Sequence, residues 1–225
     1  MDSSTTTAGG LESAPEAPHQ DPPNHSRALQ VDFSWRKFNT VVTEKDDPDS
    51  KPVYIVGFNT LHSRIVFKSA ADDSQFGTGN LHAISINTNG EIHGKNYQLK
   101  ALKRFKTSYM HLSHAYSDSD TPVPMTWTSS ANFTQWDFVC LDEQQNPVAK
   151  FSANIWGLKN LGNIEFLGPR AGNAAAREEI LVVGMTLYYT MLVRTSSVLS
   201  LFGAAFSNPG PIKQHETKNG QEQIK

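Results

Sequence analysis

Short runs of apolar and β-branched residues alternate with polar turn sequences through the middle of the chain. Within most runs apolar and polar positions alternate, which is typical of strands with one buried face. Val, Ile, Phe, Trp and Thr favour strands, and Gly, Pro, Asn and Asp separate the runs. The predicted strands are VYIVGF from Val53, RIVFK from Arg64, LHAISIN from Leu81, TQWDFVCL from Thr134 and VAKFSANIW from Val148. Strands at this spacing indicate a β-sandwich or a β-barrel.

Two connections between these runs predict hairpins. Asn89-Gly90 is a favoured two-residue turn, because both residue types tolerate a positive φ. The segment from Asp142 to Pro147 joins two alternating runs and predicts the second hairpin.

The pattern changes abruptly after Gly168-Pro169. From about Ala174 to Arg194 the chain predicts a helix, because strand alternation and proline are both absent there. Nearly every face of this helix is apolar over residues 180–193, so it cannot lie on a protein surface. The apolar run is shorter than the roughly 20 residues that a bilayer requires. We therefore expect a barrel curled around the helix, with a membrane-spanning segment over residues 180–206 as the alternative.

Polar residues in the predicted helix are few and ordered. Thr186, Thr190 and Arg194 follow one another at four-residue spacing, which places them in one narrow file. Glu178 and Glu179 come early, where their charge favours the helix N-terminus through the macrodipole.

The two ends of the chain differ from its middle. Residues 1–32 are rich in Ser, Thr, Ala, Pro and Gly, and residues 207–225 are polar and open with a Pro-Gly-Pro breaker. Such segments bury too little apolar surface to offset the entropy lost on ordering. We expect a disordered N-terminal arm over residues 1–32, one domain over residues 33–206, a disordered tail over residues 207–225, and a monomeric protein.

Charge and cysteine content indicate which kinds of partner and which cellular compartment to expect. The formal net charge is −2, from 20 basic and 22 acidic residues, which disfavours nucleic acid as a partner. Cys140 is the single cysteine, so no internal disulfide can form, and we expect it to be a small core residue. The N-terminal segment lacks the regions of a signal peptide. These features predict a cytoplasmic protein.

The last third of the predicted domain resembles a known family. The blocks WDFVCLDEQQNPVAKF from Trp136, GNIEFLG from Gly162 and REEILVVGMTLYYTMLVR from Arg177 resemble the fungal branch of tubby C-terminal-like proteins, related to the LURP-one and phospholipid scramblase folds. The chain departs from the group in two places. The hairpin turn from Asp142 to Asn146 contains no glycine, and a Tyr-Tyr pair lies within the predicted helix. The resemblance implies a mostly β fold, an antiparallel barrel of about a dozen strands that encloses the C-terminal helix. Members include phosphoinositide binders and proteins linked to lipid movement.

A basic segment, residues 95–106, is the strongest charge feature of the chain. Its sequence KNYQLKALKRFK contains no acidic residue. The candidate anion-binding residues are Lys95, Lys100, Lys103, Arg104 and Lys106. One interpretation is a site for anionic phospholipids or phosphoinositides that brings the protein to a membrane surface as a peripheral component. The other is a solvated strand whose lysines prevent edge-to-edge aggregation.

Candidate chemistry is otherwise sparse. His111 and His114 lie near Asp118 and Asp120, but no further ligand pair follows at a useful spacing, so we expect surface histidines in a loop and no metal site. The segment Gly77–Gly79 lacks the other residues of a nucleotide-binding loop and predicts a turn. No nucleophile motif is present. We expect a protein without a cofactor that is not an enzyme, and an enzyme with a concealed site is the remaining alternative.

Overall fold

The structure of the chain is a computed structural model. The structure describes residues 27–34, 39–47, 49, 51–59, 62–82, 85–103, 107–131, 135–154, 157 and 159–206, and for residues 131, 135 and 196–206 the backbone alone. Residues 1–26 and 207–225, most of the predicted arm and the whole predicted tail, lie outside the described residues.

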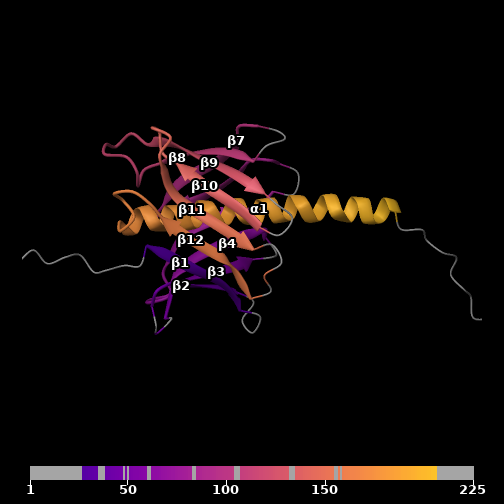
Figure 1. The fold of residues 1–225 in the computed structure, drawn as a ribbon, viewed down its shortest axis with the longest axis horizontal. Helices are drawn as coiled ribbons and strands as arrows, with labels where there is room; N and C mark the ends of the chain where they lie inside the picture. The colour runs from indigo at the N-terminus through magenta and orange to yellow at the C-terminus, as the bar shows by residue number, and fades with distance from the viewer. Residues whose placement is uncertain are drawn as a thin grey trace, which may run out of the picture.

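Twelve antiparallel strands form a closed barrel (Figure 1). The strands are β1 (Ala28–Ser34), β2 (Asn39–Glu44), β3 (Pro52–Asn59), β4 (Arg64–Ser69), β5 (Gln75–Asn80), β6 (Thr88–Ile92), β7 (Lys95–Ala101), β8 (Ser108–Ser113), β9 (Val123–Ala131), β10 (Gln135–Leu141), β11 (Pro147–Asn154) and β12 (Asn160–Phe166). Each strand pairs with its neighbour in sequence, and β1 pairs with β12 to close the sheet. The predicted barrel is confirmed.

Strand β1 corrects the predicted domain boundary. It begins at Ala28, whereas the sequence predicted a disordered arm as far as Asp32. Leu29 and Val31 point into the barrel and are fully buried, while Gln30 between them is half-buried. Two inward side chains are too short a signal to stand out beside the polar segment that precedes them, and pairing with both β2 and β12 stabilises the strand.

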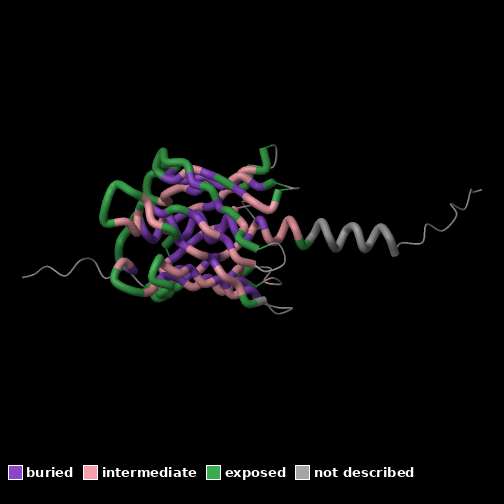
Figure 2. The backbone as a smooth tube through the Cα atoms, turned by 90° about the horizontal axis from the view of Figure 1, so that it is seen from above, coloured by how far each residue is buried: buried purple, intermediate pink, exposed green. Residues whose placement is uncertain are grey.

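Helix α1 (Ala174–Phe206) passes through the barrel. Asn173 caps its N-terminus, since Asn173 Oδ1 accepts a hydrogen bond from the Ala176 amide at 2.9 Å. Residues 180–188 are buried throughout, and Figure 2 shows the helix changing from buried to intermediate and exposed as it leaves the strands. The predicted enclosed helix is confirmed. It continues beyond the expected end at Arg194, because neither proline nor a C-terminal glycine stop follows there.

Strands on all sides of the barrel contact the helix. Tyr188 packs against Trp136 of β10 and Phe151 of β11, with ring centroids 6.2 and 5.6 Å apart. On other strands, Thr40 of β2 bonds the Tyr189 hydroxyl at 3.1 Å, and the indole of the buried Trp127 on β9 lies against the helix backbone. Apolar burial around the whole helix supplies the main driving force for closing the sheet.

The predicted polar file of the helix makes hydrogen bonds inside the barrel. The Tyr97 hydroxyl donates to Thr186 Oγ1 at 3.1 Å, and Thr190 Oγ1 donates to the Thr186 carbonyl at 2.7 Å. Arg194 Nη1 donates to the Tyr109 hydroxyl at 2.7 Å. The side chains of this file thus keep partners, which avoids the cost of burying them unpaired.

Two glycines of β5 let the helix approach the sheet closely. A Cβ atom on Gly77 would lie 2.6 Å from Val182 Cγ2, and one on Gly79 would lie 2.1 Å from Thr186 Oγ1. The prediction of a turn at residues 77–79 is therefore wrong, since these residues are a buried part of β5. Glycine serves here for close packing rather than for turn geometry.

The β6–β7 hairpin turns later than predicted. Asn89 and Gly90 lie within β6, and the turn is His93-Gly94, where φ is 47° and 76°. A Cβ on Gly90 would lie 2.0 Å from the Thr78 carbonyl oxygen, so this glycine too is needed for close approach. The preference for Asn-Gly turns was outweighed by the packing of β6 against its neighbours.

Of the remaining predictions, the second hairpin and four of the five strands agree with the structure, and one strand does not. The Asp142–Pro147 hairpin between β10 and β11 is confirmed, with the Asn146 amide donating to Asp142 Oδ1 at 2.7 Å. Four of the five predicted runs overlap strands β3, β4, β10 and β11. The run from Leu81 is wrong, because β5 ends at Asn80 and the described residues 81, 82 and 85–87 form a connection.

The membrane-anchor alternative required residues 180–206 to face lipid. The strands instead bury residues 180–188 completely, so this segment cannot also cross a bilayer while the barrel is intact. In the part of the chain that the structure describes, no helix combines the length and the apolar character needed to cross a membrane.

Candidate functional site

The barrel is least continuous between β7 and β8. Both strands are described in full, and the ladder between them consists of Lys100↔Met110 and Ala101↔Tyr109. On its other side β7 pairs with β6 all the way from Lys95 to Leu99. The two strands therefore diverge toward the end of the barrel where the helix begins. We name the opening between residues 95–99 and residues 111–114 the β7–β8 groove.

Two adjoining hollows of about 370 and 250 Å³ follow the β7–β8 groove. They share the lining residues Asn96, Tyr97, Leu112 and His114. Leu112 is 51% exposed, which is unusual for a large apolar side chain and gives the groove an apolar wall. An opening with polar backbone, one apolar wall and adjacent cations is suited to binding rather than to packing.

His111 and Glu179 form a buried pair beneath the β7–β8 groove. Because a carboxylate can only accept, His111 Nε2 donates to Glu179 Oε1, at 3.2 Å, and the Ala115 amide donates to Oε2 at 3.3 Å. Burial by itself raises the pKa of Glu179, but hydrogen bonds from His111, Ser113 and Ala115 and the His111 charge outweigh it, so that the pKa is lowered. Glu179 remains ionised at neutral pH and ties β8 to helix α1.

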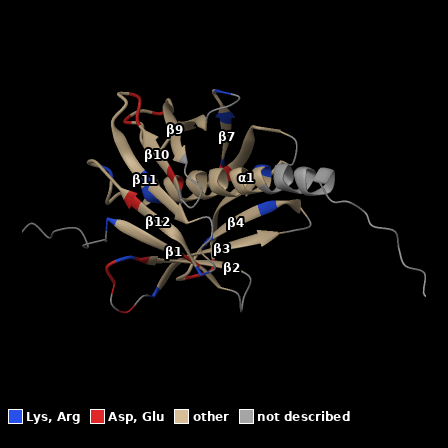
Figure 3. Ribbon diagram, turned by 45° about the vertical axis from the view of Figure 1, so that its right-hand side comes forward, with Lys and Arg blue, Asp and Glu red and all other residues tan. Residues whose placement is uncertain are grey.

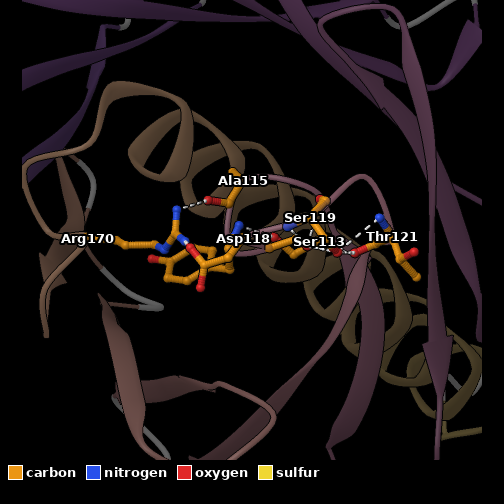
Figure 4. A network of polar contacts seen from close by, with 8 residues as sticks. Ser113, Ala115, Asp118, Ser119, Thr121 and Arg170 are labelled. Atoms are coloured by element: carbon orange, nitrogen blue, oxygen red, sulfur yellow. Dashed lines mark hydrogen bonds and ion pairs between the residues drawn. The ribbon is translucent and has the colours of Figure 1, made fainter.

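The connection after β8 is held by a second polar network (Figure 4). Arg170 points toward Ala115 and Asp118, donating to the Ala115 carbonyl at 3.0 Å and forming an ion pair with Asp118. Ser117 Oγ donates to the Thr121 carbonyl at 2.6 Å. These contacts fix the end of β8 against the segment that leads into the helix.

The structure divides the basic segment that the sequence singled out. Lys100 and Lys103 are both exposed near the end of β7 where the helix leaves the barrel, and Figure 3 shows the basic residues on this strand. Lys95 is exposed at the opposite end of β7, about 17 Å away at ~3.4 Å per residue. Arg104 and Lys106 lie outside the described residues. Lys95 and Lys100 both border the β7–β8 groove.

The histidines and acids considered as metal ligands are separated. His111 is fully buried in β8 rather than in a surface loop, so that expectation is wrong for this residue, while His114 is exposed in the groove. Asp118 is paired with Arg170. Within the described ranges no group of three or more His, Cys, Asp or Glu side chains could hold a metal ion.

The pairing of His111 with Glu179 was not predicted from the sequence. Glu178 and Glu179 were expected at the helix N-terminus, but both lie beyond the first turn of α1. Glu178 Oε2 instead lies 2.6 Å from His93 Nε2. The buried position of His111 could have been inferred from strand alternation, because Tyr109 and Ser113 are also inward. The separation of β7 from β8 had no sequence signal.

Comparison of the chain with protein-family models, with curated proteins and with solved structures finds no match. The resemblance to tubby C-terminal-like proteins therefore stays a prediction, and its expected architecture is the part that the fold supports.

Proposed function

We propose that this chain is a non-catalytic, cytoplasmic binding module that associates peripherally with anionic phospholipids or phosphoinositides. The observation that carries the proposal is the combination of exposed Lys100 and Lys103 with Leu102, which is 50% exposed between them. A cationic surface with a projecting apolar side chain suits the boundary between lipid headgroups and acyl chains.

Magnitudes favour a weak, reversible association. Each cation near an anionic leaflet contributes about 1 kcal/mol, so Lys100 and Lys103 together would supply about 2 kcal/mol. Leu102 adds apolar contact that a purely electrostatic surface lacks. Arg104 and Lys106 continue the same basic segment in sequence and would strengthen the attraction.

Co-sedimentation with vesicles tests the proposal. We expect the protein to pellet with vesicles of phosphatidylcholine that contain phosphatidylserine or a phosphoinositide, and to stay in solution with phosphatidylcholine alone. The double substitution Lys100→Ala/Lys103→Ala should weaken binding by about 30-fold, the equivalent of ~2 kcal/mol.

The matched control is Lys45→Ala/Lys51→Ala, which removes two exposed lysines near the other end of the barrel. This variant should bind anionic vesicles as the unmodified protein does. Equal binding to neutral and anionic vesicles, or equal losses for the two double variants, would contradict the proposal.

A further inference from the structure

The backbone along the β7–β8 groove has a defined orientation. The Leu102 amide donates to the Ser108 carbonyl at 2.8 Å. The even-numbered residues of both strands therefore direct their backbone amides and carbonyls across the gap between β7 and β8. Because the direction alternates along each strand, Asn96 and Gln98 of β7 face β8, and Leu112 of β8 faces β7. The β7–β8 ladder ends before any of these three residues.

The groove therefore has two open strand edges. The same residues, Asn96, Gln98 and Leu112, line the hollow of about 370 Å³, so these parts of both strands border open space. Unpaired edges of this kind are templates for an additional strand. From Lys95 to Leu99 the edge of β7 is about 14 Å long, enough for a strand of about five residues.

Each side of the groove is anchored separately. β7 is joined to β6 by the tight His93-Gly94 turn and to the helix by Tyr97, whose hydroxyl contacts Thr186. β8 is held by the His111–Glu179 pair. The two strands are therefore tied to helix α1 by different buried contacts.

The side chains around the groove select the chemistry of the added strand. Lys95 and Lys100 are exposed at its two ends, and His114 lies along it. The Glu179 carboxylate, which lines the smaller hollow, is already engaged by His111 and the Ala115 amide. The exposed Leu112 offers an apolar contact. We propose that the β7–β8 groove binds an extended, acidic segment of a partner protein by strand addition, with the backbone of Asn96 and Gln98 pairing with the incoming strand.

This inference is independent of lipid binding, and one substitution separates the two. Gln98→Pro removes the amide that faces the groove without changing charge, and it breaks no ladder bond because the β7–β8 ladder ends at Lys100. Gln98→Ala, which keeps the amide, is the matched control. Gln98→Pro should leave vesicle binding unchanged, whereas Lys100→Ala/Lys103→Ala should reduce it.

The probe is a fluorescein-labelled peptide with alternating apolar and acidic residues, Val-Glu-Val-Asp-Val-Glu, measured by fluorescence anisotropy with the full chain. We expect saturable binding that weakens at least tenfold when lysine replaces the acidic residues, when alternate peptide amides are N-methylated, or when the protein carries Gln98→Pro. Gln98→Ala should bind as the unmodified protein does.

Three results would overturn the proposal. The first is equal affinity for the acidic and the lysine peptide, and the second is equal affinity for the N-methylated peptide, a comparison that needs no protein variant. The third is binding that appears only after residues 1–26 are removed, because the occupant would then be the N-terminal segment of this chain rather than a partner.

Discussion

Gly79 and Thr186 illustrate how closely single residues govern the contact between sheet and helix. Thr186 is fully buried and its Oγ1 accepts a hydrogen bond from Tyr97. The absence of a side chain at Gly79 is what leaves room for this threonine. Residues of this kind contribute through close fit, so small additions of volume are costly.

Gly79→Ala should lower the free energy of unfolding by about 1–3 kcal/mol, because its Cβ would overlap Thr186, a fully buried β-branched residue. Gly57→Ala in β3 is the matched control, since a Cβ there has no neighbour within 4 Å, and it should change stability by less than about 0.5 kcal/mol. Urea denaturation measures both. Equal effects of the two substitutions would contradict the close packing of β5 on α1.

Glu179 gives the barrel an acid-sensitive contact. Its pKa is lowered in the folded protein, so the ionised form stabilises the fold above the ordinary glutamate pKa of about 4.3. This contribution is lost as the pH falls through the lower, folded value. Urea unfolding at about pH 7 and about pH 3 should show a smaller acid loss for Glu179→Gln than for the unmodified protein.

Glutamine keeps the shape and one acceptor oxygen for His111, but its NH2 group cannot accept from the Ala115 amide and it cannot ionise. The lost hydrogen bond lowers stability at both pH values, so the difference between the two pH values reports the charge. Glu143→Gln, at an exposed position in the β10–β11 turn, should retain the full acid loss. Parallel pH dependence for Glu179→Gln and the unmodified protein would show that the buried pair contributes no acid sensitivity.

At the scale of the element, helix α1 and strand β7 have opposite surroundings. The helix has partners on every face over residues 180–188, so its position is determined by burial. Strand β7 pairs with β6 from Lys95 to Leu99 but with β8 only at Lys100 and Ala101. The proposed peptide site follows from this asymmetry, and the proposed lipid-binding surface lies at the exposed end of the same strand.

At the scale of the whole molecule, closure depends on β1, the strand that the predicted boundary cut through. β1 pairs with β2 and with β12, and its side chains Leu29 and Val31 are fully buried. Burying two such residues contributes roughly 3–6 kcal/mol, a large part of the 5–15 kcal/mol by which domains are stable.

A chain that begins at Arg27 should therefore melt at the temperature of the full chain, whereas one that begins at Phe33 should lose the cooperative transition. Circular dichroism during thermal unfolding distinguishes them. If both shortened chains melted alike, β1 would be dispensable and the closed barrel would not be the stable unit.

The sequence alone determined the class of the fold. Alternating runs, turn residues and a segment that is apolar on all faces specify strands around an enclosed helix, because burial of that segment is the largest free-energy gain available to the chain. The Asp142–Pro147 hairpin and the helix start were predictable for the same reason, since local pattern and tertiary environment agree there.

Tertiary structure alone decided the local geometry. The Asn89-Gly90 turn preference, worth little by itself, was overridden when Gly90 had to lie against the Thr78 carbonyl. The pairing of His111 with Glu179 and the divergence of β7 from β8 join residues far apart in sequence, and no local pattern encodes such distances. The candidate site therefore depends on how the strands pair around the helix. Only its basic residues could be identified from the sequence.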